Sequence, residues 1–153
     1  MLTSRPRRNR STAAIRAMAT ETHLSTSHLV FPLFVMDGQH IKSEIKSLPG
    51  IYRFSPENLL REIESCMELG LTNFVLFPAV ADALKDVTAT YSYHPDNFYL
   101  KVARDIKARF PECCLISDVA MDPYSSDGHD GLVRNGAIVN DETLPILAQM
   151  SIA

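Results

Sequence analysis

The densest group of chemically functional side chains lies in residues 118–131, DVAMDPYSSDGHDG, which hold four aspartates and one histidine. Asp118 directly follows an apolar run, where an ionised carboxylate can hold a substrate ammonium or accept hydrogen bonds from loop amides. In parallel α/β folds, the loops after the carboxyl ends of the strands build the active site. The sequence therefore favours a functional loop here, with Asp118 as a candidate substrate-binding residue.

The other aspartates of this loop are candidate metal ligands. Asp122, Asp127 and Asp130 supply hard oxygen atoms, which suit Mg²⁺ rather than a soft metal. Their spacing is not that of an EF-hand, and Asx turns beside the glycines could use two of them instead. His129 could carry a proton or hydrogen-bond a neighbouring aspartate. From the residues alone, a magnesium site and a structural loop both stay open.

Three apolar runs, at residues 29–35, 72–77 and 114–119, are typical of strands buried on both faces. Pro32 weakens the first run, which indicates an edge or barrel-lip strand, or one that begins after the proline. The second run is expected to end at Pro78. Residues 36–54 are interpreted as a loop with a turn at Pro49-Gly50.

Helical spacing of apolar residues predicts two helices between these strands. The first is expected to begin with Ser55 as its cap and Pro56 at its first position, and to end at Gly70. The second follows residues 94–96 and stops before Pro111. The alternation of buried strands and helices predicts parallel βα units, and hence an α/β fold.

Beyond the aspartate loop, Asn135-Gly136 predicts the tight turn of a hairpin. Asn140 or Asp141 is expected to cap a last helix, in which Pro145 is tolerable only in the first turn. This helix runs to Ala153 with no capping glycine, lysine or polar tail. We therefore expect the chain to be cut rather than naturally closed.

The charge is uneven along the chain. Residues 1–20 carry five arginines and no acid, whereas residues 21–153 carry ten basic and eighteen acidic residues, a net charge of −8. Such a basic cluster attracts phosphate, but no aromatic residues interleave it to stack on bases. An acidic body on a neighbouring copy is a complementary partner. We interpret residues 1–25 as an assembly arm, through Arg5, Arg7, Arg8 and Arg10, rather than as a tail that binds nucleic acid, and residues 26–153 as the following domain.

The sequence lacks the signals of several classes of protein. The longest apolar stretch, residues 29–35, is far short of the roughly 20 residues that cross a bilayer, and no secretory signal is evident. Cys66, Cys113 and Cys114 fit neither a disulfide framework nor a spaced metal motif. The sequence has no glycine-rich phosphate loop, nucleophile elbow or paired metal histidines. A protein that does not associate with membranes and lies in the cytoplasm is expected.

The arm, the apolar runs and the aspartate loop together resemble porphobilinogen synthases (5-aminolevulinate dehydratases) over nearly the whole chain. The chain is similar to the N-terminal half of a bacterial member of the zinc-independent type. Five motifs stand in the family's order and spacing: RPRRNR at residues 5–10, FPLFV and DG at 31–38, LPGIYR at 48–53, LF at 76–77, and ISDV running on to GL at 116–132.

The resemblance implies a TIM-type (β/α)₈ barrel, incomplete in this chain, with an N-terminal arm that embraces a neighbouring subunit, usually within a homo-octamer. It also implies the condensation of two 5-aminolevulinate molecules to porphobilinogen with loss of two waters, an early step of haem and tetrapyrrole synthesis. Two lysines of the family hold the substrates as Schiff bases. In this resemblance Asp118 lines the substrate pocket.

The lysines depart from the family pattern. Five are present, and all lie in predicted loops or on a helix, none at a strand end, so both Schiff-base lysines are expected beyond Ala153. A typical barrel needs about 250 residues, so three predicted strands cannot close. The five are Lys42, Lys46, Lys85, Lys101 and Lys107.

The metal-binding positions depart as well. Zinc-dependent members carry three cysteines where this chain has Ala120, Asp122 and Asp130. Zinc needs a near-tetrahedral set of soft ligands, which these residues cannot supply. We therefore expect no zinc, possible Mg²⁺ and no organic cofactor. Asp122 and Asp130 are the candidate magnesium ligands, although the family commonly binds Mg²⁺ outside this loop.

Two hypotheses follow for the chain as a whole. The first is a fragment of an active, zinc-independent porphobilinogen synthase, inactive alone because it lacks the lysines. The alternative is a catalytically inert half-barrel that associates with full-length subunits through its arm, although its open sheet would expose an edge and an apolar face.

Overall fold

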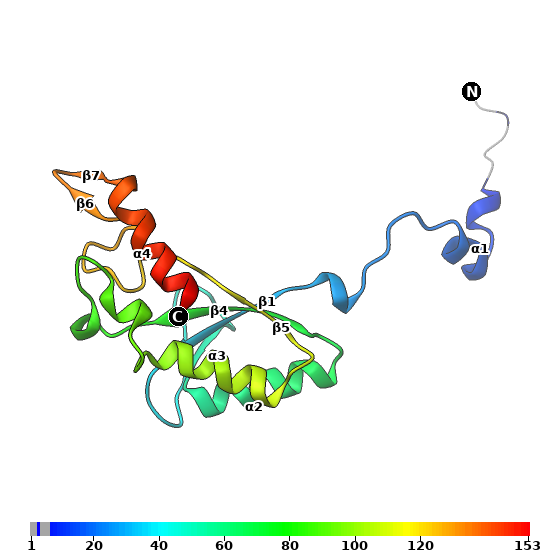
Figure 1. Ribbon diagram of the computed structural model, residues 1–153. Helices are drawn as coiled ribbons and strands as arrows, with labels where there is room; N and C mark the ends of the chain where they lie inside the picture. The colour runs from blue at the N-terminus through cyan, green and yellow to red at the C-terminus, as the bar shows by residue number, and fades with distance from the viewer. Residues whose placement is uncertain (1–2, 4–6) are drawn as a thin grey trace.

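The computed structural model describes residue 3 and residues 7–153, so Arg5 of the predicted arm lies outside the described residues. A five-stranded sheet in the order β2-β3-β1-β4-β5 forms the centre of the fold (Figure 1). All neighbours are parallel except β2 and β3, which confirms the α/β fold. The strands are β1 (Phe31–Met36), β2 (Lys42–Glu44), β3 (Tyr52–Phe54), β4 (Asn73–Ala79) and β5 (Cys114–Ser117).

Strand β1 lies inside the sheet although it contains a proline. It pairs with β4 along its whole length, including Pro32 beside Val75. On its other side, β3 pairs only with Phe34 and Val35. Pro32 therefore has a neighbouring strand on one side only, which is where a residue without an N–H is tolerated in a sheet.

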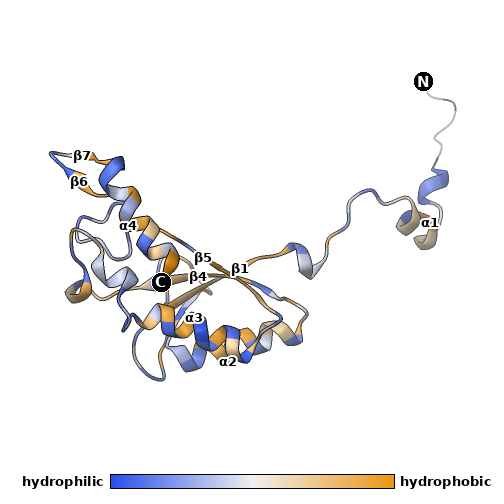
Figure 2. Cartoon of the chain, in the orientation of Figure 1, coloured by the Kyte–Doolittle hydropathy of each residue, from blue (hydrophilic) through white to orange (hydrophobic). Residues whose placement is uncertain are grey.

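The hydrophobic core lies between one face of this sheet and two helices, α2 (Pro56–Glu68) and α3 (Phe98–Arg109). Figure 2 shows β1, β4 and β5 as largely apolar, whereas α2 and α3 mix apolar and polar residues. Side chains alternate across a strand, so every second residue of β1 and β4 reaches the helices. These buried strand residues are Leu33, Val35, Phe74 and Leu76, and their helical partners include Leu59, Ile63, Val102 and Ile106.

Both helices lie where the sequence predicted them, which confirms that prediction. Asn97 caps α3, because its side chain accepts a hydrogen bond from the Tyr99 amide at 2.9 Å. Gly70 follows α2 with a φ of +81°, a left-handed conformation that glycine adopts without strain. Ser55 precedes α2 as predicted, but its side chain does not cap the helix. Its hydroxyl accepts a hydrogen bond from the Ile41 amide at 2.9 Å and so ties the preceding loop to the helix start.

The interpretation of residues 36–54 as a loop was wrong. Strands β2 and β3 lie there, and Glu44 pairs with Tyr52 across the turn. Each strand has only three residues, too few to show an alternation in the sequence. The pairing of β3 with β1 gives these residues their extended conformation.

The ends of β4 and β5 also differ from the predicted ones. Strand β4 continues through Pro78 to Ala79, beside Val35 and Met36 of β1, instead of ending at the proline. Strand β5 ends at Ser117 rather than residue 119, because β4 pairs with it only as far as Leu76. Asp118 is therefore the first residue after β5.

The last part of the chain forms a hairpin and a helix. Strands β6 (Val133–Arg134) and β7 (Ala137–Ile138) pair across Asn135-Gly136, both with positive φ, as predicted. Helix α4 (Asn140–Ile152) starts without a side-chain cap, so the predicted capping by Asn140 or Asp141 was wrong. Pro145 lies in the second turn rather than the first, so the Asp141 carbonyl four residues earlier receives no helical N–H from it.

The residues that precede β1 extend away from the sheet (Figure 1). They form two short 3₁₀ turns, η1 (Arg8–Arg10) and η2 (Thr26–His28), and one helix, α1 (Ala13–Met18). Thr12 caps α1, accepting a hydrogen bond from the Ile15 amide at 3.2 Å. Two further 3₁₀ turns, η3 (Asp82–Leu84) and η4 (Thr90–Tyr93), lie between β4 and α3. Within residues 7–153, none of the helices has the length and apolar character that spanning a membrane requires.

Candidate active site

The carboxyl ends of β1, β4 and β5 lie at the same edge of the sheet, because the three strands are parallel. A cavity of about 750 Å³ opens at this edge. Asp118, the candidate from the sequence, lines it together with Asp122. The charged residues of the lining are Asp37, Arg53, Lys85, Asp118 and Asp122.

Two stacked aromatic rings form an apolar part of the cavity wall. Phe34 of β1 and Phe77 of β4 are register partners, and their ring centroids lie 5.4 Å apart with an angle of 26° between the planes. Both point to the face of the sheet opposite α2 and α3, since they alternate with the core residues. An apolar wall with a few charged groups around it is typical of small-molecule sites.

The alternation of side chains along β5 accounts for the direction of Asp118. Leu115 packs against the core, and Ser117 lies beside the core residue Leu76. Asp118 falls on the opposite face, the same face as Phe77. Its side chain is solvent-exposed within the cavity lining, as a group that meets a ligand must be.

A buried tyrosine fixes the strand end below this carboxylate. The Tyr99 hydroxyl of α3 donates a hydrogen bond to the Leu76 carbonyl of β4 at 3.0 Å. Burial raises the pKa of Tyr99 to about 12, and a backbone hydrogen bond from Asp118 opposes part of that rise. The tyrosine therefore stays neutral at physiological pH and connects the ends of β4 and β5.

The structure brings three of the predicted aspartates close together. Burial raises the pKa of Asp122, and a hydrogen bond with the Asp130 side chain and the negative charges of Asp130 and Asp118 raise it further. Among residues 7–153, however, no group of three or more potential ligand side chains is arranged to hold a metal ion. The loop thus offers a pair of carboxylates, Asp122 and Asp130, rather than a complete protein ligand set.

A small second core holds the aspartate loop in place. Met121 and Tyr124 are buried against Ala89 and against α4. The Tyr124 hydroxyl accepts a hydrogen bond from the Asn97 amide nitrogen at 3.3 Å, and burial raises the pKa of this tyrosine above its usual range. Asp86, in the connection after β4, also exchanges backbone hydrogen bonds with residues 124–126. The loop is therefore anchored on both sides of Asp122.

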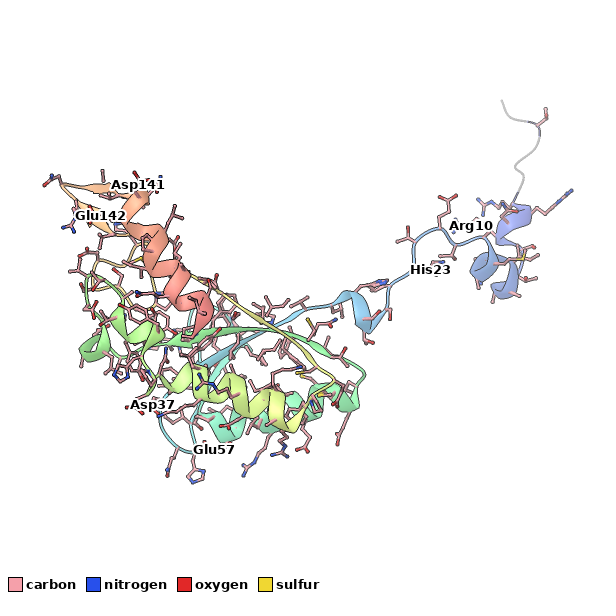
Figure 3. All side chains as sticks on the ribbon, in the orientation of Figure 1. Arg10, His23, Asp37, Glu57, Asp141 and Glu142 are labelled. Carbon is pink, nitrogen blue, oxygen red and sulfur yellow. The ribbon has the colours of Figure 1, made fainter. Side chains whose placement is uncertain are left out.

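Other candidates from the sequence lie away from the cavity. Asp127 and His129 are exposed, and neither side chain forms a hydrogen bond within residues 7–153. Arg7, Arg8 and Arg10 lie in the arm, far from the sheet; Figure 3 labels Arg10 there and Asp37 beside the sheet.

Sequence reasoning missed two cationic residues of the cavity. Arg53 went unnoticed because β3 was not predicted, so nothing indicated which way its side chain points. Lys85 was correctly placed in a loop, but only the folded chain shows that this loop borders the cavity. The alternation of Phe54, which is buried in the core, with Arg53 is the signal that could have found the arginine.

The fold and the site define a parallel α/β domain with a charged cavity at its strand ends, the usual arrangement of an enzyme active site. A family model described as delta-aminolevulinic acid dehydratase matches residues 3–153. This chain therefore belongs to the delta-aminolevulinic acid dehydratase family, as the resemblance predicted.

Individual relatives agree with this assignment. The delta-aminolevulinic acid dehydratase of Chlamydia pneumoniae is 49% identical over 150 residues, which are 98% of this chain and 45% of the relative. The chloroplastic enzyme of Selaginella martensii is 43% identical over 99% of this chain and 37% of the relative. A crystal structure of the Toxoplasma gondii ME49 enzyme matches with a TM-score of 0.91 and 43% identity. The match covers 99% of this chain and 43% of that chain. That enzyme is also named porphobilinogen synthase and was solved in complex with its reaction product, porphobilinogen. The chain thus spans less than half the length of these relatives.

Proposed function

We propose that this chain forms the first part of a 5-aminolevulinate dehydratase, which condenses two 5-aminolevulinate molecules to porphobilinogen with loss of two waters. The reaction is an early step of haem and tetrapyrrole synthesis. The observation that carries the proposal is the cavity at the strand ends, where aspartates and cations surround an apolar wall in a chain of this family. The Toxoplasma gondii relative was solved with porphobilinogen. This molecule carries an ammonium and carboxylates, which aspartates and cations can bind.

The charges of the cavity suit the substrate. 5-Aminolevulinate carries an ammonium, a ketone and a carboxylate. Asp118 would hold the ammonium by a charge-assisted hydrogen bond. The Phe34–Phe77 wall would exclude water from the ketone and so strengthen these interactions.

The Schiff-base lysines implied by the resemblance would lie outside these 153 residues. A lysine attacks a ketone as a neutral amine. Lys85 is the lysine that borders the cavity, and its ammonium forms an ion pair with Asp82 at 2.8 Å. Its amine is not available to a ketone while this pair holds.

The sheet would be the first part of a TIM-type (β/α)₈ barrel. Strands β1, β4 and β5 with α2 and α3 follow the strand–helix order of such a barrel, with the helices on one face. The other face carries Phe34 and Phe77, as the interior of a barrel would. The TM-score of 0.91 over 43% of the Toxoplasma gondii chain supports this placement.

A chimera tests the proposed function. This chain, continued with the remaining C-terminal part of the Chlamydia pneumoniae relative, should convert 5-aminolevulinate to porphobilinogen, detected by a colorimetric pyrrole reagent. The activity should survive strong zinc chelators, because Ala120, Asp122 and Asp130 replace soft ligands. A folded chimera that makes no porphobilinogen would contradict the proposal, and zinc-dependent activity would contradict the metal assignment.

The aspartate pair would hold Mg²⁺ rather than Zn²⁺. Magnesium commonly takes one or two carboxylates and completes its six oxygen ligands with water, which fits Asp122 and Asp130. A bound Mg²⁺ would offset the negative charge that Asp118, Asp122 and Asp130 concentrate in this loop.

Magnesium binding should weaken steeply as the pH falls. Burial, and then the neighbouring carboxylates, raise the pKa of Asp122, so this group takes up a proton at a higher pH than an isolated aspartate. Protons and Mg²⁺ then compete for it. Titration calorimetry between about pH 7 and about pH 4 should show the loss.

Substitutions at the two carboxylates provide the control for this measurement. Asp122→Asn and Asp130→Asn should each remove Mg²⁺ binding at about pH 7. Asp105→Asn, at an exposed position of α3, should leave it unchanged. Binding that persists in both loop variants would place magnesium elsewhere.

The arm would assemble copies of the chain into a homo-octamer. Arg8 and Arg10 are exposed, and no ion pair forms at either within residues 7–153, so both are open to an acidic partner. Such a partner exists in the body of a second copy, where acidic residues outnumber basic ones. The cytoplasm remains the expected location, whereas the Selaginella martensii relative is named as chloroplastic.

One observation favours the inert half-barrel as a second candidate. Strand β5 ends the sheet within the described part of the chain, and Ile116 on it is 42% exposed. A strand edge of this kind pairs readily with another chain. Co-purification with a full-length relative, without any activity of the chimera, would favour this candidate.

A further inference from the structure

Asp86 lies in the connection after β4, where this connection meets the aspartate loop. Lys85, which precedes it, lines the cavity, whereas Asp86 does not. The main chain of Asp86 forms a short parallel bridge with Ser125. The Asp86 amide donates a hydrogen bond to the Tyr124 carbonyl at 3.2 Å, and the Ser126 amide donates one to the Asp86 carbonyl at 3.0 Å. Asp86 therefore joins the two segments through its backbone.

The carboxylate of Asp86 binds groups of its own segment. Its Oδ1 accepts hydrogen bonds from the Thr88 amide at 2.8 Å, the Thr88 hydroxyl at 3.0 Å and the Thr90 amide at 3.2 Å. Its Oδ2 accepts a hydrogen bond from the Thr90 hydroxyl. Burial alone would raise the pKa of Asp86, but the hydrogen bonds from Thr90 and Thr88 outweigh it and lower the pKa. The ionised carboxylate thus fixes the turn formed by residues 86–90.

This turn holds Ala89 in a conformation that alanine rarely adopts. Ala89 has a φ of +53°, in the left-handed region that favours glycine. It is fully buried, and it shares a core cluster with Met121 and Tyr124 of the aspartate loop. A strained residue of this kind persists only where the surrounding contacts fix it. The Asp86 carboxylate supplies two of these contacts, because the amides that it binds belong to the residues on either side of Ala89.

The segment that Asp86 holds lies between the two carboxylates of the candidate magnesium site. Asp122 precedes residue 124 by two positions, and Asp130 follows residue 126 by four. A hydrogen bond nevertheless joins the Asp122 and Asp130 side chains, so the loop reverses its direction between them. A displacement of residues 124–126 would therefore change the separation of the two carboxylates.

From these contacts we propose that Asp86 is a positioning residue for the Asp122–Asp130 pair. Its carboxylate fixes the turn of residues 86–90, and its main chain holds the middle of the aspartate loop against this turn. Asp86 acts through the loop and contacts no ligand itself. The inference rests on the proposed function for the use of Mg²⁺ as a probe, whereas the link between the two segments rests on the hydrogen bonds of Asp86.

Two substitutions of Asp86 in the 153-residue chain test this assignment. Asp86→Ala removes every hydrogen bond that the carboxylate accepts. Asp86→Asn keeps an oxygen for both amides of the turn, and its NH₂ group can donate to the Thr90 hydroxyl, so it should behave as the wild type does. Asp105→Ala, which removes an exposed aspartate from α3, is the matched control. Circular dichroism checks the fold of each variant.

Hydrogen exchange followed by NMR gives a readout that needs no metal. In Asp86→Ala, the amides of residues 86 and 126 should exchange faster by about 10-fold or more, because the segments that they join open locally. The amides of α2 should keep their wild-type rates. The amide signals of Asp122 and Asp130 should also shift in this variant, whereas Asp86→Asn and Asp105→Ala should leave both the rates and the signals unchanged.

Titration calorimetry with Mg²⁺ reports on the carboxylate pair itself. Magnesium demands a nearly ideal arrangement of its oxygen ligands, so it tolerates little change in the separation of two carboxylates. Asp86→Ala should therefore weaken Mg²⁺ binding by about 10-fold or more. Asp86→Asn and Asp105→Ala should retain the wild-type affinity.

The outcomes separate this inference from the proposed function. Unchanged exchange at residue 126 in Asp86→Ala would overturn the assignment, and so would an equal increase in α2, which indicates a general loss of stability. Faster exchange with unchanged signals of Asp122 and Asp130, or with unchanged Mg²⁺ affinity, would also overturn it. A wild-type chain that bound no Mg²⁺ would overturn the proposed metal, while the exchange rates and the signals of the metal-free chain would still decide the role of Asp86.

Discussion

Asp118→Ala should weaken the binding of 5-aminolevulinate, the proposed substrate, by about 10- to 100-fold, because hydrogen bonds to charged groups contribute about 1.5–3 kcal/mol. The free energy of unfolding should change by less than about 0.5 kcal/mol, since the side chain is exposed and its carboxylate forms no hydrogen bond within residues 7–153. Titration calorimetry measures the first quantity and urea denaturation the second.

Asp105→Ala is the matched control for this prediction. It removes an exposed aspartate from α3, outside the cavity, and should change neither quantity. Asp118→Ala could instead destabilise the fold by as much free energy as it costs in binding. The carboxylate would then accept hydrogen bonds from loop amides, the structural role that the sequence also allowed.

Phe74→Ala should lower the free energy of unfolding by about 3–5 kcal/mol. Phe74 is fully buried between β4 and the helices α2 and α3, and its removal leaves a cavity in the main core. Small domains have about 5–15 kcal/mol of stability in total, so this variant should be close to unfolding. Urea denaturation followed by circular dichroism measures the change.

Phe77 provides the comparison within the same strand. It lies on the opposite face of β4, partly exposed in the cavity wall, and stacks on Phe34. Phe77→Ala should therefore cost less stability than Phe74→Ala but should weaken ligand binding, because the apolar wall is lost. Equal losses of stability in the two variants would show that the cavity face is packed as tightly as the core face.

Local patterns were sufficient for the elements that carry the core. The spacing of Leu59 and Ile63, together with Pro56 and Gly70, located α2, because a helix buries one face and needs specific residues at its ends. The continuous apolar runs located β1, β4 and β5, although within residues 7–153 the helices cover only one face of these strands and β5 is largely exposed, contrary to the prediction of strands buried on both faces. These signals lie within a few residues of one another, and sequence reasoning can detect them.

Short elements could not be predicted, because other parts of the chain determine them. Three-residue strands such as β3 have no period of their own and become extended only beside β1. The start of α4 at Asn140, with Pro145 in its second turn, goes against local preference. Packing of Met150 and its neighbours against Met121 and Tyr124 outweighs that preference.

The sequence by itself determined the family and the α/β class and pointed to Asp118 as a candidate, because motifs, apolar runs and a carboxylate after a strand are local features. Only the tertiary structure decided that Asp118 and Asp122 share a cavity with Arg53 and Lys85. The reason is the parallel sheet, which brings strand ends far apart in the sequence to one edge and alternates side chains between its faces. The face on which Arg53 lies follows from the register between β3 and β1.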